Sequence, residues 1–421
     1  MRSFYKYTLT GLLLCLFSLA GTAQTLAELL AASDSANLEL QALYHEYLAA
    51  RERGPQVSQL PEPEFGLGLF VLPVETRLGP QWVRLSASQM FPWKGTLQAR
   101  EDVAIAMASV RYERIAATRL LLHDQIRTAY IRLQEMDWKQ VILRDNIALT
   151  QELERIVTTR VETGRASLAD LLRIQVKTRG LEEELKLVEN LKHIPQATIN
   201  QVLNRRVDLS IVPMDTLVVA NLNHDRDPVF AAIRDEHPSL RMLALQQEVS
   251  QKTIQLNALE GKPSFNAGID YIAVGRRSDA TPAGNGRDIL SPRIGIRIPI
   301  YRDKYRAKAQ EEKWTIQALE YRKEDQFLQF QREVEQAYAE YEDGRIRHAL
   351  AREQKAIIQS AIELQLTAYS TNGAGFLDLI QMEDQLLQYD LQMLSAMVKT
   401  QMAQAQLQKI IPQSERPDHE E

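Results

Sequence analysis

The stretch Val161-Glu-Thr-Gly-Arg-Ala-Ser-Leu-Ala-Asp-Leu-Leu172 recurs as Tyr369-Ser-Thr-Asn-Gly-Ala-Gly-Phe-Leu-Asp-Leu-Ile380, without a gap and at an offset of 208 residues. Each copy interrupts a sequence that is otherwise typical of helix, and Gly164 or Gly373 supplies the backbone freedom that a reversal needs. The repeat therefore predicts two long helices that each fold back at a similar tip.

The segments that precede these tips are long and free of proline. From Lys94 to about Thr163 there is one glycine, and apolar residues recur three to four positions apart, which is typical of a helix packing along a seam. A helix of about 70 residues would reach roughly 100 Å, which is too long for a compact globular core. The second segment carries Ala337-Tyr338, which matches Ala129-Tyr130 at the same offset of 208 residues. The two long helices are therefore expected to end at the same height.

A β-hairpin precedes each long helix. Period-two alternation of apolar and polar residues predicts strands at about 64–72, 81–92, 264–274 and 289–301. In the last of them, isoleucines at alternate positions from 294 to 300 share one face, and Arg293 and Arg297 share the other. The strands therefore predict a sheet with an apolar side and a polar side.

The chain is thus expected to contain two repeats of hairpin, long helix, tip and returning helix. The expected division is a signal peptide at 1–23, a first repeat at 24–222, a second repeat at 223–412 and a polar tail at 413–421. The long and returning helices are expected at about 95–163 and 167–203, and again at about 303–370 and 376–410. Two further helices are expected at about 25–53 and 238–260, and an irregular stretch with proline breakers precedes the second of these.

The first residues predict export. Arg2 and Lys6, an apolar run and then Gly21-Thr-Ala23 form the series of a secretory signal peptide. The only cysteine, Cys15, lies inside that run, so the mature chain would have no thiolate zinc site, thiol catalysis or disulfide. No later apolar segment has the length of a transmembrane helix, so entry into a membrane would require a β-barrel.

Other function classes find no support in the sequence. The formal net charge of -5 gives no basic footprint for nucleic acid. The seven histidines are scattered without metal-ligand spacing on a helix, so no metal site is expected. No phosphate-cradling glycine loop or nucleophile elbow is present, and we expect neither a cofactor nor enzymatic activity.

Strands with one apolar face and unpaired edges need further strands to complete them. Their lengths suit tilted transmembrane strands, so we expect an oligomer whose strands form one β-barrel and whose long helices form a second, coaxial barrel. The apolar face would contact lipid. The barrel lumen would receive polar side chains, among them Arg84, Asp270, Arg293 and Arg297.

With these features the chain resembles the outer-membrane efflux factor family, the TolC-like proteins. The resemblance covers essentially the whole mature sequence. It is carried by the strand ends Phe91-Pro92 and Ile298-Pro299 and by the tip motifs Thr163-Gly164-x-x-Ser167-x-x-Asp170-Leu-Leu172 and Asn372-Gly373-x-x-Phe376-x-Asp378-Leu-Ile380. The chain departs from the lipidated branch of the family, because Leu14 rather than a small residue precedes Cys15.

The resemblance implies a homotrimer with a twelve-strand barrel in the outer membrane and a twelve-helix tunnel in the periplasm. It also implies that the tips dock to a periplasmic membrane-fusion adaptor, which links the channel to an inner-membrane efflux pump. A resistance-nodulation-division pump is one candidate, since the chain's size and short extracellular loops are similar to the branch paired with heavy-metal cation exporters. The exported substrate stays open between metal cations and drugs or other small molecules.

Two acidic residues are candidates for a periplasmic gate. Asp170 and Asp378 each lie one turn into a returning helix, where three chains would supply up to six carboxylates to a cation-selective constriction. The alternative is that each carboxylate stabilises a helix N-terminus, with Ser167-x-x-Asp170 as a capping box. Gly164, Ser167, Leu168, Gly373 and Phe376 are the candidates for the tip turns and for adaptor docking. Leu168 and Phe376 could instead close the interior of the helical hairpins.

Two hypotheses follow for the whole molecule. The first is a passive exit duct of a tripartite exporter. The second is a structural periplasmic coiled-coil scaffold without channel activity, in which the strands form a small cap. The first is favoured by the strand alternation and its isoleucine face.

Overall fold

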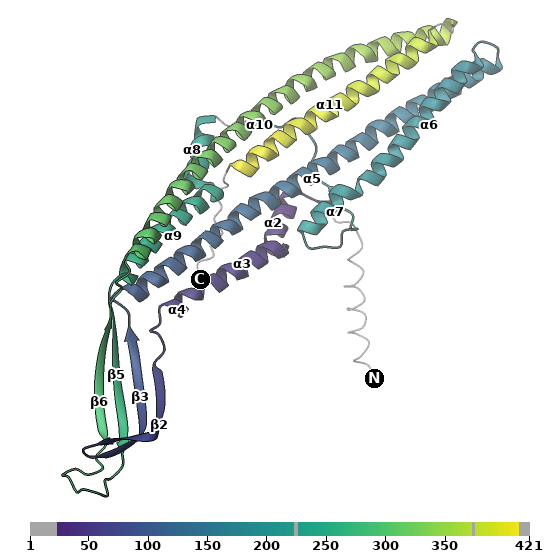
Figure 1. The fold of residues 1–421 in the computed structure, drawn as a ribbon. Helices are drawn as coiled ribbons and strands as arrows, with labels where there is room; N and C mark the ends of the chain where they lie inside the picture. The colour runs from purple at the N-terminus through teal and green to yellow at the C-terminus, as the bar shows by residue number, and fades with distance from the viewer. Residues whose placement is uncertain (1–22, 223–225, 373–374, 412–421) are drawn as a thin grey trace, which may run out of the picture. The chain divides into compact units, whose positions relative to one another are not determined.

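The computed structural model describes residues 23–222, 226–372 and 375–411, and it is mostly helical with one four-stranded antiparallel sheet (Figure 1). The helices are α2 (Leu26–Ala36), α3 (Leu38–Arg51), α4 (Arg53–Val57), α5 (Thr96–Glu162), α6 (Leu168–Leu191), α7 (His193–Val202), α8 (Arg226–Glu236), α9 (Pro238–Glu260), α10 (Asp303–Asn372) and α11 (Phe376–Ile410). The strands are β1 (Ala23–Gln24), β2 (Glu64–Thr76), β3 (Gly79–Phe91), β4 (Val212–Pro213), β5 (Ser264–Val274) and β6 (Ile289–Arg297). The mostly helical character and the antiparallel sheet confirm the prediction. The signal peptide and the polar tail lie outside the described residues, apart from Ala23.

The chain folds as two compact units. The first contains the described residues within 1–41, 116–237 and 327–421, and the second contains 42–115 and 238–326. Both long helices, α5 and α10, begin in the second unit and end in the first. The division of the chain into two sequence repeats remains a proposal.

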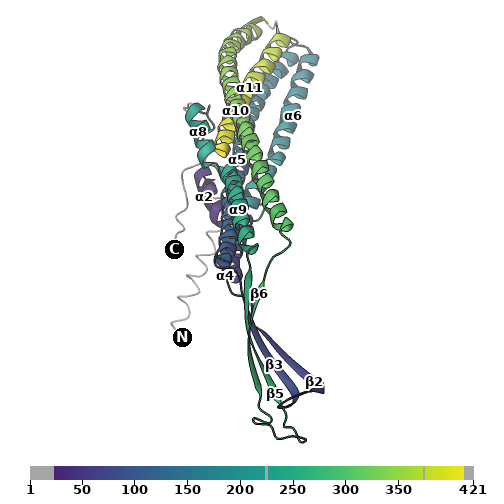
Figure 2. The same cartoon turned by 60° about the vertical axis from the view of Figure 1, so that its left-hand side comes forward.

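The second unit contains the sheet, whose strand order is β2-β3-β5-β6 (Figure 2). Residues opposite one another in the ladder share a face, and Gly66, Ser86, Asp270 and Ser291 form one such row. The neighbouring row joins apolar residues: Leu67, Leu85, Tyr271 and Leu290. The sheet therefore has the expected polar and apolar sides, and β2 and β6 are its edges.

The first unit is built around parts of four long helices. In both views α11 and α5 lie between α10 and α6 (Figures 1 and 2). A core cluster near the tips joins all four helices through Val157, Ile174, Ile362 and Leu379. Near the tips, α5 is thus buried against three other long helices.

The expected first helix at 25–53 is three helices. The side chain of Asn37 ends α2 and caps α3, since its Oδ1 accepts hydrogen bonds from the amides of Glu39 and Leu40. Gly54-Pro55 does not stop the chain's helical course but lies within the short α4.

The returning helix expected at 167–203 is interrupted at Lys192. Pro195 has no amide and its ring crowds the carbonyl four residues earlier, so α6 ends at Leu191 and α7 begins anew at His193. Helix α8 occupies part of the stretch expected to be irregular, because Pro228 falls in its first turn, where a missing amide costs nothing. Strand β6 ends at Arg297, before Pro299, so Ile298 and Ile300 lie beyond it.

Candidate functional site

The first tip is a regular helix end followed by a capped helix start. Gly164 has φ +70, its amide donates to the Val161 carbonyl, and the Arg165 amide donates to the Arg160 carbonyl. These two bonds form a Schellman motif, which places glycine in the left-handed position. A Cβ added at Gly164 would meet nothing within 4 Å, so the backbone conformation alone requires glycine there.

The start of α6 fits part of the capping-box alternative. Ser167 is the N-cap residue, and its hydroxyl accepts a hydrogen bond of 3.1 Å from the amide of Ala169. The Asp170 carboxylate does not return to the cap but pairs with Arg173 at 3.0 Å. Asp170 lies in the first turn of α6, and the charge of Arg173 partly neutralises its own.

In the described part of the second tip, α11 begins at a glycine in the left-handed region. Gly373 lies outside the described residues, and Gly375 is the N-cap of α11 with φ +78. A Cβ added at Gly375 would lie 1.8 Å from Nε2 of Gln365, whose side chain donates to the Gly375 carbonyl at 3.1 Å. The left-handed conformation favours glycine here, and a larger residue would also have to displace the end of the Gln365 side chain. The sequence analysis did not single out Gly375, because the contact with Gln365 comes from ten residues earlier.

Asp378 differs from Asp170 in its surroundings. It is exposed in the first turn of α11 and makes no ion pair with another described residue. Asp378 is therefore the more exposed of the two acids, and among the described residues only Asp170 has an ion-pair partner.

The two apolar candidates at the tips have opposite environments. Leu168 is 60% exposed, whereas Phe376 is 5% exposed and packs against Tyr369 with ring centroids 5.5 Å apart. Phe376 is therefore a core residue that closes the interior of its hairpin. Leu168 is the one of the pair that a docking partner could contact.

Two contacts connect the first hairpin to the second near the tips. Arg160 on α5 donates from Nη1 to the Tyr369 carbonyl on α10 at 3.0 Å, and its guanidinium lies 4.9 Å from the centre of the Tyr369 ring. Lys177 on α6 pairs with Asp384 on α11 at 3.0 Å. These contacts hold the two hairpins of one chain together near the tips.

A buried carboxyl group lies beside the second contact. Glu383 is 1% exposed and its Oε2 has no hydrogen-bond partner. Burial raises the pKa of Glu383, the nearby Lys177 opposes this, and Asp384 adds to it. The sequence analysis did not single out Glu383, although a glutamate in an apolar seam position was a visible signal.

The polar side of the sheet brings together three of the four predicted lumen residues. Asp270 is 5% exposed and pairs through Oδ2 with Arg84 at 2.9 Å and with Arg293 at 3.9 Å. Arg297 lies on the same face, with Nη1 3.8 Å from Sδ of Met90. Their place in a barrel lumen remains a proposal.

The two matched tyrosines of the long helices are both seam residues. The Tyr130 hydroxyl lies 2.9 Å from Oδ2 of Asp215 and accepts from the amides of Met214 and Asp215. Burial is the main cause that raises the pKa of Tyr130 to about 12. Tyr338 lies beneath the guanidinium of Arg226 at 5.2 Å.

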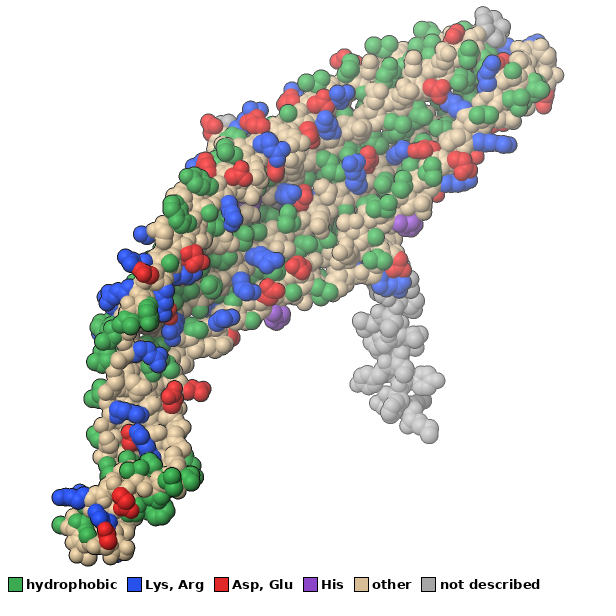
Figure 3. Space-filling view, viewed as in Figure 1, with side chains coloured by type: hydrophobic (Ala, Val, Ile, Leu, Met, Phe, Trp, Pro, Cys, Tyr) green, Lys and Arg blue, Asp and Glu red, His purple; other side chains and the backbone are tan. Residues whose placement is uncertain are grey.

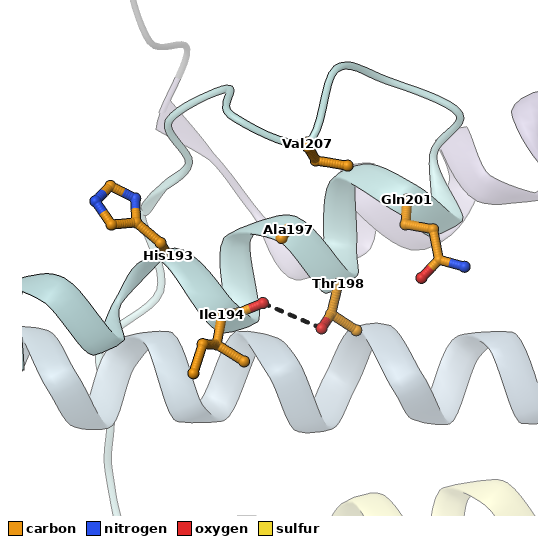
Figure 4. A pocket seen from close by; sticks show the side chains of 6 residues that line it. All are labelled: His193, Ile194, Ala197, Thr198, Gln201 and Val207. Atoms are coloured by element: carbon orange, nitrogen blue, oxygen red, sulfur yellow. Dashed lines mark hydrogen bonds between the residues drawn. The ribbon is translucent and has the colours of Figure 1, made fainter.

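A shallow hollow of about 560 Å³ lies on α7 and the loop after it (Figure 4). It is lined by His193, Ile194, Ala197, Thr198, Gln201 and Val207, without a carboxylate, lysine or arginine.

Within the described ranges, no group of three or more His, Cys, Asp or Glu side chains could hold a metal ion. On the face seen in Figure 3, acidic and basic side chains are mixed along the helices rather than gathered by sign. In the same part of the chain, no helix combines the length and the apolar character needed to cross a membrane.

Comparison with known proteins shows the fold. No family model and no curated protein sequence matches the chain. Among solved structures, it is similar to the channel protein CusC, with a TM-score of 0.74 and 15% identity, over 94% of this chain and 95% of that one. It is also similar to the outer membrane protein VceC of Vibrio cholerae, with a TM-score of 0.73 and 12% identity, over 92% of this chain and 95% of the other. The open state of the MtrE outer membrane channel of Neisseria gonorrhoeae gives a TM-score of 0.70 and 17% identity, over 92% of this chain and 88% of that channel. The chain therefore has the fold of these outer-membrane channels along nearly its whole length.

Proposed function

We propose that the chain is the outer-membrane channel of a tripartite efflux system, a passive duct across the periplasm that an adaptor opens at its tips. The observation that carries the proposal is the sheet with an exposed apolar side, joined to long helices in the fold of outer-membrane channels. The channel itself does no chemistry, and the partner pump supplies the energy.

The exposure of the apolar side supports insertion into the outer membrane. Phe65 is 80% exposed and Ile294 is 83% exposed, and both lie on strands at the edges of the sheet. A contiguous apolar face of this kind is unstable in water and stable against lipid tails. Strands of 9 to 13 residues also suit a tilted crossing of the hydrocarbon layer.

The unpaired edges support a closed assembly of several copies. Three copies of the four-stranded sheet would give a barrel of 3 × 4 = 12 strands without an edge. Arg84, Asp270, Arg293 and Arg297 would then face its water-filled lumen, where mixed charges are tolerated.

The outer helices of the first unit offer surfaces for the same assembly. On α10, Leu350, Ile357 and Leu364 are exposed and recur every seven residues, which is the spacing of a coiled-coil seam. On α6, exposed Leu172 and Val176 lie one turn apart. We infer that α10 of one copy packs against α6 of the next, which closes a ring of helices in a homotrimer.

The tips are the proposed contact with a periplasmic membrane-fusion adaptor. Leu168 is an exposed apolar anchor of the kind that packs into a groove between partner helices. Asp378 would contribute one carboxylate per chain to the constriction where the tips converge. The inner-membrane pump is reached only through the adaptor.

Membrane fractionation of cells that produce the full chain tests the proposal. We expect the protein in the outer-membrane fraction and, in detergent, as a trimer that resists mild heating and dissociates on boiling. The coiled-coil scaffold alternative predicts a soluble periplasmic protein without such a trimer. Recovery as a soluble periplasmic monomer would overturn the channel function.

A further inference from the structure

A small cavity in the first unit lies beside the middle of α5. Its volume is about 170 Å³, and its walls come from α5, from the end of α11, from Leu26 on α2 and from the segment Asp215–Thr216. The wall of α5 contributes Arg127 and Tyr130, and the wall of α11 contributes Gln401, Gln404 and Gln408. Both the α5 wall and the α11 wall of the cavity therefore carry polar side chains, and the cavity lies away from the helical tips.

Arg127 has a hydrogen-bond donor without an acceptor at this cavity. The side chain lines the cavity, the residue is 4% exposed, and its Nη1 has no hydrogen-bond partner. Burial lowers the pKa of Arg127, and the nearby carboxylate of Asp124 opposes that effect. Asp124 is shared with Lys409, whose Nζ lies 3.6 Å from its Oδ2. This arrangement is costly, because the buried guanidinium shares its nearby carboxylate with Lys409 and leaves Nη1 without a hydrogen-bond acceptor.

Most other polar groups around the cavity are already engaged. Oδ2 of Asp215 accepts from the Tyr130 hydroxyl and from the Leu26 amide, each at 2.9 Å. The Gln134 side chain donates to the Asp215 carbonyl at 2.7 Å, and that of Gln401 donates to the Val218 carbonyl at 2.9 Å.

Two glutamines on the α11 wall remain available. The side-chain amides of Gln404 and Gln408 make no hydrogen bond to another described residue. The free donors of the cavity are thus a guanidinium on α5 and primary amides on α11.

We propose that this cavity binds a small carboxylate or other oxyanion, with Arg127 as the charge partner and Gln404 and Gln408 as amide donors. An anion adds a negative charge beside Arg127 and accepts a hydrogen bond from its Nη1, whereas water would supply only the hydrogen bond. The volume is several times the roughly 30 Å³ share of one water molecule, which suits a carboxylate of a few carbons. Because the walls belong to different helices, the bound anion joins α5 to α11.

Malonate is a suitable probe of this site. The purified full-length protein is dialysed to equilibrium against labelled malonate at constant ionic strength, with chloride as the balancing anion. We expect saturable binding of one malonate per chain and a higher thermal unfolding temperature than in chloride alone. The Arg127→Gln variant is expected to lose affinity by at least about tenfold. Arg132→Gln is the matched control, since Arg132 lies on the same helix but is exposed and paired with Glu135.

A second variant keeps the test decisive if Arg127→Gln fails to fold. Gln404→Glu places a carboxylate on the wall that faces Arg127, so it is expected to raise the unfolding temperature and to abolish malonate binding. Absence of saturable binding to the wild-type protein overturns the proposal. Equal malonate binding by wild type and Arg127→Gln also overturns it, because the anion would then be held elsewhere.

Discussion

The two helical tips have matching sequences but are built differently. In the first tip Gly164 ends α5 in a Schellman motif with open space around it, and Leu168 after it is exposed. In the second tip Gly375 begins α11 beneath the side chain of Gln365, and Phe376 after it is buried. Asp170 is paired with Arg173, whereas Asp378 has no ion pair among the described residues. The first tip thus exposes an apolar side chain, whereas the second exposes a carboxylate that has no ion pair with another described residue.

The largest expected difference between the tips is in the stability lost when Phe376 or Leu168 is replaced by alanine. Phe376→Ala should destabilise the second tip by about 3–5 kcal/mol, because it leaves a cavity in the core beneath the helices. Leu168→Ala should change stability by less than about 0.5 kcal/mol, because the side chain is exposed. Hydrogen exchange of the amides in the first turns of α6 and α11 measures both. Equal effects of the two substitutions would contradict the difference between the tips.

Replacing the glycines is expected to show a smaller difference, again with the greater loss of stability at the second tip. Alanine at either Gly164 or Gly375 would be held in the left-handed region, at about 1–2 kcal/mol. Gly375→Ala should cost about 1 kcal/mol more, since the new methyl group displaces Gln365 and its hydrogen bond. Hydrogen exchange at the tips again measures the cost. The excess should disappear in a Gln365→Ala background, and an excess that persists there would show that Gln365 is not its cause.

The long helices could be predicted from the sequence, but most of the differences between the tips could not. Proline-free runs and the matched Ala-Tyr pairs predicted two long helices, because helix length depends on local pattern. The role of Gly375 could not be predicted, since the side chain that approaches it comes from Gln365, ten residues earlier. The break at Lys192 is encoded locally, because Pro195 interrupts the helix there. The burial of Phe376 and the hydrogen bonds of Tyr130 to the Met214–Asp215 segment depend on tertiary packing, which no local pattern encodes.

A buried carboxyl group gives the second tip a pH dependence that the first lacks. Glu383 matches Gln175 at the 208-residue offset, and Gln175 is neutral and donates to Glu154 at 2.9 Å. Because the pKa of Glu383 is raised from 4.5, the folded tip retains its proton to higher pH than the unfolded chain does. Stability of this tip should therefore fall as pH rises above about 4.5.

Glu383→Gln tests this dependence. The variant should be more stable than wild type at neutral pH and should match it below about pH 4.5, where both carry a neutral group. Hydrogen exchange or proteolysis at the tips, followed across this pH range, measures the difference. A stability gain that is largest at acid pH would contradict the assignment.

Conductance of the purified protein in planar lipid bilayers tests the central claim most directly. We expect discrete channels with a cation preference, and we expect that preference to fall in Asp378→Asn but to change little in Asp170→Asn, whose carboxylate is already paired. An unchanged preference in Asp378→Asn would remove the acid ring from the account. The absence of any conductance from a folded, membrane-inserted trimer with its adaptor bound would contradict the duct itself.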